Sequence, residues 1–276
     1  MNVMYCGDRN IADGVLISVL SLAKVSKEPI HVYLLTAHVV TDQKDYLPIQ
    51  QEFADGLLFA MRRYQEDCSV ELLDITELFR QQLPIANMNT RFTPCCMLRL
   101  FADLLPELPD RVLYLDSDVI CREDLSDFYD QEMDDYEIAG CLDYYGSWLF
   151  RKKCFRRDYL NSGVLLLNLE KIRSTRLFES CRDRCRNRRM FMPDQSAINK
   201  LSEHKKICDR RFNEQRKLRQ DTVCQHFTTS FRVFPIFHKV SVKPWETDRM
   251  HSVLKLKEYD DLLEEYLSIK ESLYEF

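Results

Sequence analysis

The chain has 276 residues, of which 45% are hydrophobic and 30% are charged, so it can bury a full core beneath a solvated surface. Its net charge of −5 and its pI near 5.8 argue against a general nucleic-acid-binding protein. No stretch approaches the ~20 apolar residues that cross a bilayer, so we expect no transmembrane segment.

The first half of the chain alternates between strand and helix patterns. Buried apolar runs predict strands, and apolar residues at helical spacing predict helices. The predicted strands cover residues 2–6, 30–36, 69–73 and 111–116, and the predicted helices cover residues 10–25, 42–64 and 95–105. Repeated strand–helix–strand units indicate an α/β protein with a Rossmann-like, mostly parallel sheet flanked by helices on both faces.

The second half is less regular. Residues 137–142 and 163–167 are apolar and short enough to be strands, whereas residues 170–189 and 192–201 have helical spacing. The last segment, residues 246–276, is charged and helical in character. We therefore expect one α/β domain over residues 1–245, with a C-terminal helical tail over residues 246–276 packed on it.

Two aspartates follow a strongly apolar predicted strand in the sequence RVLYLDSDVI. In open α/β sheets, ligands bind outside the carboxyl ends of the strands, and Asp116 falls at such an end. Residues i and i+2 of extended backbone point the same way, so Asp116 and Asp118 can converge on one hard divalent cation. The alternative is that both are surface turn residues, because Asp-Ser-Asp also suits a turn.

Further segments make this pattern more specific: MYCGDRNIADGVLISVLSL, MLRLFADLLPELPDRVLYLDSD, YLNSGVLLLNLEKIR, MPDQSAIN and Lys-Pro-Trp at residues 243–245. Together with LYLDSDVI they resemble glycosyltransferase family 8 over residues 3–245. The resemblance implies the GT-A fold and a retaining enzyme of polysaccharide biosynthesis. Such an enzyme moves a hexose, glucose or galactose, from a UDP-sugar to a saccharide or glycolipid acceptor. Mn²⁺ or Mg²⁺ is the implied cofactor.

The resemblance also assigns residues to the donor nucleotide. Asp8 and Asn10 stand where the family holds the uracil and ribose, with Cys6 just before them, and Ser117 lies between the two aspartates. Lys243 stands where the family contacts the diphosphate, and its compact charge suits phosphate. The alternative for Asp8 and Asn10 is a plain helix N-cap.

A second set of residues is implied at the transferred sugar. Arg99 carries a planar guanidinium group whose N–H donors suit a sugar hydroxyl or a carboxylate. Asn161 would lie beside the sugar. Asp194 would bind sugar hydroxyls, Gln195 would lie close to the anomeric carbon, and Asp143 would lie near the donor sugar and the acceptor. As alternatives, Arg99 is a solvated charge on a helix, and Asp194 only helps a helix to begin.

Two histidines compete to be the third metal ligand, after Asp116 and Asp118. His226 lies in a His-Phe-Thr sequence that resembles the family's motif. It lies far before Lys243, however, so that an insertion relative to the family is required. His238 has nearly the family's spacing to Lys243, but the residues that flank it do not match the family's motif. In both cases the glycine that usually follows the histidine is missing. The sequence favours His226 slightly and leaves His238 as the alternative.

The cysteines and the N-terminus bear on where the protein works. The number of cysteines, eleven, is odd and no Cys-x-x-Cys occurs, so we expect reduced, mostly buried thiols. The N-terminal residues lack a signal peptide's basic head and apolar core. We therefore expect a cytoplasmic protein, which can contact the inner face of the membrane peripherally. The acceptor should contact residues 144–158, of which residues 151–157 are strongly basic.

Two rival functions remain open from the sequence. A nucleotide-sugar hydrolase or sugar-phosphate nucleotidyltransferase also uses acids at strand ends, although the glycine-rich loop of nucleotidyltransferases is absent from the sequence. The other rival is a non-catalytic relative that only binds nucleotide sugars.

Overall fold

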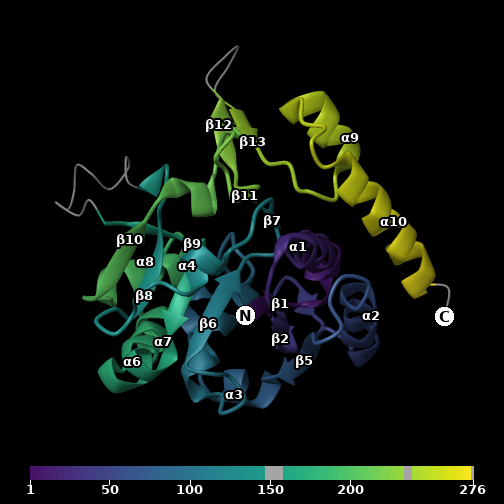
Figure 1. The fold of residues 1–276 in the computed structure, drawn as a ribbon. Helices are drawn as coiled ribbons and strands as arrows, with labels where there is room; N and C mark the ends of the chain where they lie inside the picture. Colours follow the sequence, from purple (N-terminus) through teal and green to yellow (C-terminus); the bar gives the residue numbers. More distant parts are fainter. Residues whose placement is uncertain (147–157, 233–237, 275–276) are drawn as a thin grey trace.

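A seven-stranded sheet forms the centre of the computed structural model, which describes residues 1–146, 158–232 and 238–274 (Figure 1). The strands lie in the order β10-β8-β9-β6-β1-β2-β5. Their bounds are β1 Asn2–Gly7, β2 His31–Thr36, β5 Ser69–Asp74, β6 Arg111–Leu115, β8 Ile138–Leu142, β9 Leu160–Asn168 and β10 Lys205–Cys208. The basic run at residues 151–157 lies outside the described residues.

Four of the six strand pairings are parallel, and β9 runs antiparallel to both of its neighbours, β6 and β8. The prediction of a mostly parallel sheet is confirmed. Three small two-stranded sheets lie outside it: β3 Val39–Val40 with β4 Asp45–Tyr46, β7 Val119–Cys121 with β11 Cys224–His226, and β12 Ser230–Arg232 with β13 His238–Val240.

Helices cover both faces of the sheet. The α-helices are α1 Ala12–Val25, α2 Gln51–Met61, α3 Thr76–Gln81, α4 Ser126–Tyr129, α6 Leu169–Thr175, α7 Leu177–Asn187, α8 Pro193–Leu201, α9 Thr247–Arg249 and α10 Asp260–Tyr274. The 3₁₀ helices are η1 Arg9–Ile11, η2 Ile85–Asn87, η3 Pro94–Leu104 and η4 Arg210–Asn213, and η5 Met250–Leu254 is a π-helix.

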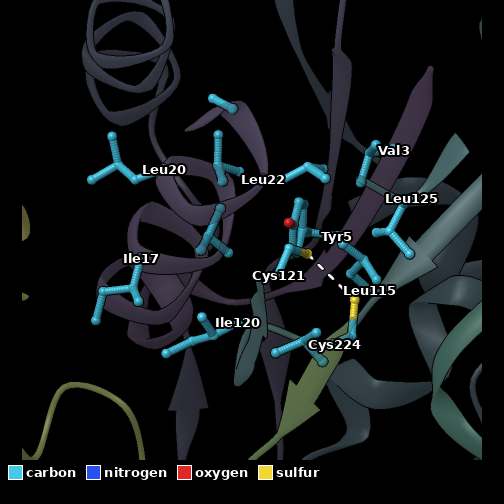
Figure 2. Close-up of a cluster of buried hydrophobic side chains, with 14 of the residues drawn as sticks. Val3, Tyr5, Ile17, Leu20, Leu22, Leu115, Ile120, Cys121, Leu125 and Cys224 are labelled. Atoms are coloured by element: carbon cyan, nitrogen blue, oxygen red, sulfur yellow. Dashed lines mark hydrogen bonds between the residues drawn. The ribbon is translucent and has the colours of Figure 1, made fainter. Parts of the chain in front are cut away.

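Strand alternation divides the core into two hydrophobic clusters, one on each face of the sheet. Val3 and Tyr5 of β1 point into the cluster under α1 and α2, whereas Met4 points into the cluster under η3 and α7. Figure 2 shows the first cluster, where Tyr5 lies among side chains of α1 and β7 and its hydroxyl is 2.9 Å from Ser18 Oγ. Strands that are apolar on both faces are therefore needed at the centre of the sheet.

Several predicted elements had wrong bounds. Residues 42–64 are not one helix, because β4 precedes Pro48 and α2 begins only at Gln51; proline disfavours a helical residue before it and donates no hydrogen bond. The predicted helix 170–189 breaks at Arg176, whose φ of 56° ends α6 and begins α7. The helix at 95–105 is 3₁₀, and β9 begins three residues before the predicted position 163.

The C-terminal helix α10 packs along α1 and α2 (Figure 1). Lys270 Nζ lies 2.8 Å from Asp13 Oδ1, and Glu265 Oε2 lies 2.5 Å from Lys24 Nζ. The Tyr64 hydroxyl also donates to Glu265. These contacts agree with a tail packed on the α/β domain, and the division at residues 245 and 246 stays a prediction.

Other buried groups agree with the expectations from composition. All ten cysteines within the described residues are free and seven of them are buried, including Cys121 and Cys224, whose sulfur atoms lie 3.6 Å apart (Figure 2). A buried ion pair joins Arg182 Nη1 to Asp103 Oδ1 at 2.5 Å. Among the residues that the structure describes, no helix has the length and apolar character that spanning a membrane requires.

Candidate active site

The two aspartates of RVLYLDSDVI lie directly after β6, the middle strand of the seven. Their backbone is not extended, which corrects the sequence argument. β6 ends at Leu115, and the Val119 N–H donates to the Asp116 carbonyl oxygen at 3.2 Å, which closes a turn. The turn, rather than strand alternation, therefore directs both carboxylates to one side. Asp-Ser-Asp is a turn sequence and part of a candidate cation site at once.

His226 completes the cluster. Asp116, Asp118 and His226 each place one possible ligand atom within 4.8 Å of the others. His226 ends β11, which pairs with β7, so that His226 lies opposite Val119. Its Nε2 atom is 3.1 Å from Asp118 Oδ1 and 3.6 Å from Asp116 Oδ2. The alternative, His238, lies in β13, and its side chain is outside the described residues.

Two neighbours fix the His226 ring. Its Nδ1 atom is 3.1 Å from Asn213 Oδ1, and because an amide oxygen only accepts, Nδ1 donates this hydrogen bond and Nε2 is directed at the carboxylates. The ring also packs on Gly163, where a Cβ atom would lie 2.6 Å from Nδ1 and 2.8 Å from Nε2. Both distances are shorter than van der Waals contact, so only glycine leaves room for the ring.

Each aspartate uses one oxygen for the protein and turns the other toward the imidazole. Asp116 Oδ1 accepts hydrogen bonds from Arg99 Nη2 at 2.9 Å and from the Tyr114 hydroxyl at 2.6 Å. Asp118 Oδ2 accepts a hydrogen bond from Lys243 Nζ. The remaining two oxygens and Nε2 of the imidazole converge, and a cation or a proton between them would offset their mutual repulsion. This donor set suits a divalent cation that keeps positions open for other ligands.

The charges of Asp118 and Lys243 depend on each other. Burial would raise the pKa of Asp118, but Lys243 and His226 outweigh burial and hold this pKa well below its usual value of 3.8. Burial would likewise lower the pKa of Lys243, but the Asp118 carboxylate outweighs it and raises this pKa above 10.5. The pair is ionised at neutral pH, and a cation held at this site would compete with the ammonium group for Asp118.

Arg99 is a buried organising residue rather than a solvated charge, since it is only 4% exposed. Its Nη1 atom donates to the Ser162 carbonyl oxygen at 2.6 Å, and its Nε atom lies 3.3 Å from Asp194 Oδ2. Its guanidinium group stacks 3.8 Å above the Tyr114 ring. Its hydrogen-bond partners here are protein atoms, so Arg99 holds Asp116 and Asp194 in place.

The other residues expected at the sugar share one buried hydrogen-bond network. Asp143 Oδ2 accepts from Asn161 Nδ2 at 2.9 Å and from Gln195 Nε2 at 3.3 Å. Gln195 Oε1 accepts from the Ser162 N–H at 3.0 Å. Asn213 Nδ2 donates to Asn161 Oδ1 at 2.9 Å, which links this network to the imidazole of the cation cluster.

The residues expected at the nucleotide lie along the neighbouring strand end. Asp8 is buried and accepts from Asn10 Nδ2 at 2.5 Å, and its side chain makes no cap to η1, so it is not a plain N-cap. Cys6 lies near the end of β1, and burial raises the pKa of its thiol, which therefore stays protonated. A Cβ atom at Gly14 of α1 would lie 2.5 Å from the Ser117 carbonyl oxygen, so this glycine lets α1 approach the turn.

Two residues of the site were missed by sequence reasoning. Tyr114 is buried, and burial raises its pKa well above 10.0, so its hydroxyl keeps the proton that it donates to Asp116. Its position two residues before Asp116 was the available signal. Asn213 lies in η4 and contacts both His226 and Asn161, and its sequence surroundings gave no comparable signal.

The sheet order, the strand-end turn and the acidic cluster define a class of protein, the GT-A fold glycosyltransferases. An active-site mutant of LgtC superimposes with a TM-score of 0.70 at 18% identity, covering 99% of this chain and 96% of that one. The galactosyltransferase LgtC in complex with donor and acceptor sugar analogues gives 0.67 at the same identity and coverage.

The chain belongs to glycosyltransferase family 8, whose profile, described as "Glycosyl transferase family 8", matches residues 2–249. It is 27% identical over 223 residues to a lipopolysaccharide 1,2-glucosyltransferase of Escherichia coli, covering 77% of this chain and 62% of the relative. It is 28% identical over 231 residues to a lipopolysaccharide 1,3-galactosyltransferase of Salmonella typhimurium, covering 78% and 63%. The chain thus spans less than two thirds of the length of these curated relatives.

Proposed function

We propose that this protein is a retaining hexosyltransferase that moves glucose or galactose from a UDP-sugar to a hydroxyl group of a saccharide or glycolipid acceptor. Membership of family 8 and the names of its lipopolysaccharide glucosyl- and galactosyltransferase relatives support this class of reaction. The observation that carries the proposal is the convergence of Asp116 Oδ2, Asp118 Oδ1 and His226 Nε2 beside Lys243. A nucleotide-sugar donor also suits a cytoplasmic reaction.

The three convergent atoms would hold Mn²⁺ or Mg²⁺, because two carboxylate oxygens and an imidazole nitrogen fit either ion. When bound, the cation supplies Lewis-acid stabilisation of the negative charge on the departing diphosphate. Lys243 carries a charge that suits the same purpose, and its ammonium group leaves Asp118 for the phosphate oxygens. Asp8, Asn10, Cys6 and Ser117 would contact the uridine, as the resemblance to the family implies.

The buried amides and carboxylates position the hexose. Asp143 and Asp194 can accept hydrogen bonds from sugar hydroxyls, and Asn161 can donate to them. An amide is a poor nucleophile, and both polar ends of the Gln195 amide are already hydrogen-bonded. We therefore favour attack by the acceptor hydroxyl on the face from which the diphosphate leaves. The new bond joins the acceptor oxygen to the anomeric carbon, and the acceptor proton passes to a departing phosphate oxygen.

A donor screen with UDP-glucose and UDP-galactose, with and without Mn²⁺, tests the proposal. We expect metal-dependent UDP release that is accompanied by a glycosylated acceptor from a panel of simple saccharides. UDP release without any glycoside product would favour a nucleotide-sugar hydrolase. Binding of UDP without turnover of either donor would favour the non-catalytic relative.

Asp118→Asn keeps the size of the side chain and removes one ligand charge. It should lower turnover at least about a hundredfold, because losing a direct ligand exceeds the loss from its supporting hydrogen bonds. Asp127→Asn is the matched control, since Asp127 is a highly exposed aspartate on α4. Equal turnover in the two variants would contradict the cation site.

A further inference from the structure

A cavity of about 760 Å³ opens directly beside the candidate active site. Asp143 and His226, which belong to the two parts of that site, also line this cavity. Its walls come from η4 and the residues after it, from the end of β11, and from the chain that joins η5 to α10. A molecule in the cavity therefore lies next to the reacting centre, as the acceptor must under the proposed function.

Apolar and aromatic side chains form one wall of the cavity. Phe227, Val240 and Val242 are buried and line it, as does the exposed Tyr144. The guanidinium group of Arg216 stacks 4.3 Å above the Tyr144 ring and donates a hydrogen bond to its hydroxyl. Such side chains accommodate the apolar face of a sugar ring, and the charged residues that also line the cavity can select its substituents.

Two of the three acidic residues that line the cavity already have cationic or buried amide partners. Asp143 accepts from the buried amides described above. Glu214 Oε2 is 2.9 Å from Arg210 Nη1 and 3.4 Å from Arg219 Nε. Glu258 Oε2 accepts from the Lys257 backbone N–H at 3.0 Å, and its charge is the one acidic charge of this wall without a cationic or buried amide partner within the described residues.

The basic residues include three whose charges are not neutralised by the protein. Arg216 contacts Tyr144 rather than a carboxylate, and Lys217 and Lys255 make no ion pair within the part of the chain that the structure describes. All three are exposed at the cavity. Three positive charges against Glu258 leave an excess of positive charge, although the whole chain carries −5.

We propose that this cavity is the acceptor site and that it selects acceptors that carry a negatively charged group, a phosphate or a carboxylate. The inference rests on the proposed function, since it assigns the substrate class of the same site. Lys217, which follows η4, and Lys255, which follows η5, both line the cavity and offer rotatable ammonium donors, and charge-assisted hydrogen bonds are stronger than neutral ones. They are specificity-determining residues.

Galactose, galactose 6-phosphate and galacturonic acid are suitable probes, because they share a ring and differ in charge. Their binding to the full chain is measured by calorimetry with UDP and Mn²⁺ present at saturation, so that the diphosphate site is filled. We expect the anionic sugars to bind about tenfold more tightly than galactose, an advantage that decreases at high salt. The two anionic sugars tell phosphate from carboxylate as the preferred group.

The double variant Lys217→Gln/Lys255→Gln should remove this advantage, so that the two anionic sugars bind no more tightly than galactose. Lys257→Gln is the matched control, because Lys257 is an exposed lysine two residues from Lys255 that does not line the cavity. The inference is overturned if the three sugars bind equally, or if the double variant keeps the preference for anionic sugars. Binding is read without turnover, so a failure of the proposed transferase activity would show separately in the donor screen.

Discussion

Replacing Gly163 with alanine tests the geometry of the candidate cation site without removing any polar group. The added Cβ atom would lie 2.6 Å from His226 Nδ1 and 2.8 Å from His226 Nε2. The ring atom Cε1 lies even closer to the added Cβ atom, and carbon atoms in contact lie at least about 3.5 Å apart, so the imidazole must move by more than about 1 Å. It cannot rotate away freely, because Asn213 holds Nδ1 and the ring is 5% exposed.

The consequence for metal binding is large. Metal–nitrogen distances hold within about 0.2 Å, so a ring displaced this far no longer ligates, and Mn²⁺ affinity should fall about a hundredfold. The overpacking itself should cost about 1–3 kcal/mol of the free energy of unfolding. Mn²⁺ titration by calorimetry and urea unfolding of the metal-free protein measure the two effects separately.

Gly140→Ala is a control in the same sheet. Its Cβ atom would meet the end of the Leu165 side chain at 2.8 Å, away from the cation cluster, so it should affect stability and leave Mn²⁺ affinity unchanged. Wild-type Mn²⁺ affinity and turnover in Gly163→Ala would refute the placement of His226 as a ligand. Equal losses of affinity in both variants would mean that the effect is general.

Three other substitutions follow from contacts described above. Asn213→Ala removes the hydrogen bond that orients His226, and Mn²⁺ affinity by calorimetry should fall about 10- to 100-fold. In Glu265, burial would raise the pKa, but Lys24 and its other partners outweigh burial and lower this pKa below its usual 4.5. Its contribution, about 1 kcal/mol, is therefore present above pH 4.5 and lost as the pH falls through the folded-state pKa. Glu265→Gln should thus lower Tm at pH 7 and not at strongly acidic pH. Asp103→Ala leaves the buried guanidinium group of Arg182 without its carboxylate partner and should lower the free energy of unfolding by about 3–5 kcal/mol, measured in urea. A decrease below about 1 kcal/mol would contradict this.

Most of the sheet could be predicted from local patterns. β1, β2, β5 and β6 are short apolar runs, and burial on both faces leaves little room for another interpretation. Helix bounds were less predictable, because α2 begins only after Pro48 and the left-handed backbone at Arg176 ends α6, whereas spacing alone predicts longer helices at both places. The small sheets β7–β11 and β12–β13 were missed, since a three-residue strand carries too little periodicity to be recognised.

The sequence determined that Asp116 and Asp118 stand at the end of a buried strand and that the segments around them carry the pattern of glycosyltransferase family 8. The tertiary structure decided which atoms meet there. His226 reaches the aspartates only because β11 pairs with β7, and its ring fits only because Gly163 on β9 leaves the space open. Contacts between segments far apart in the chain depend on packing, and packing leaves no periodic mark in the sequence from which it could be predicted.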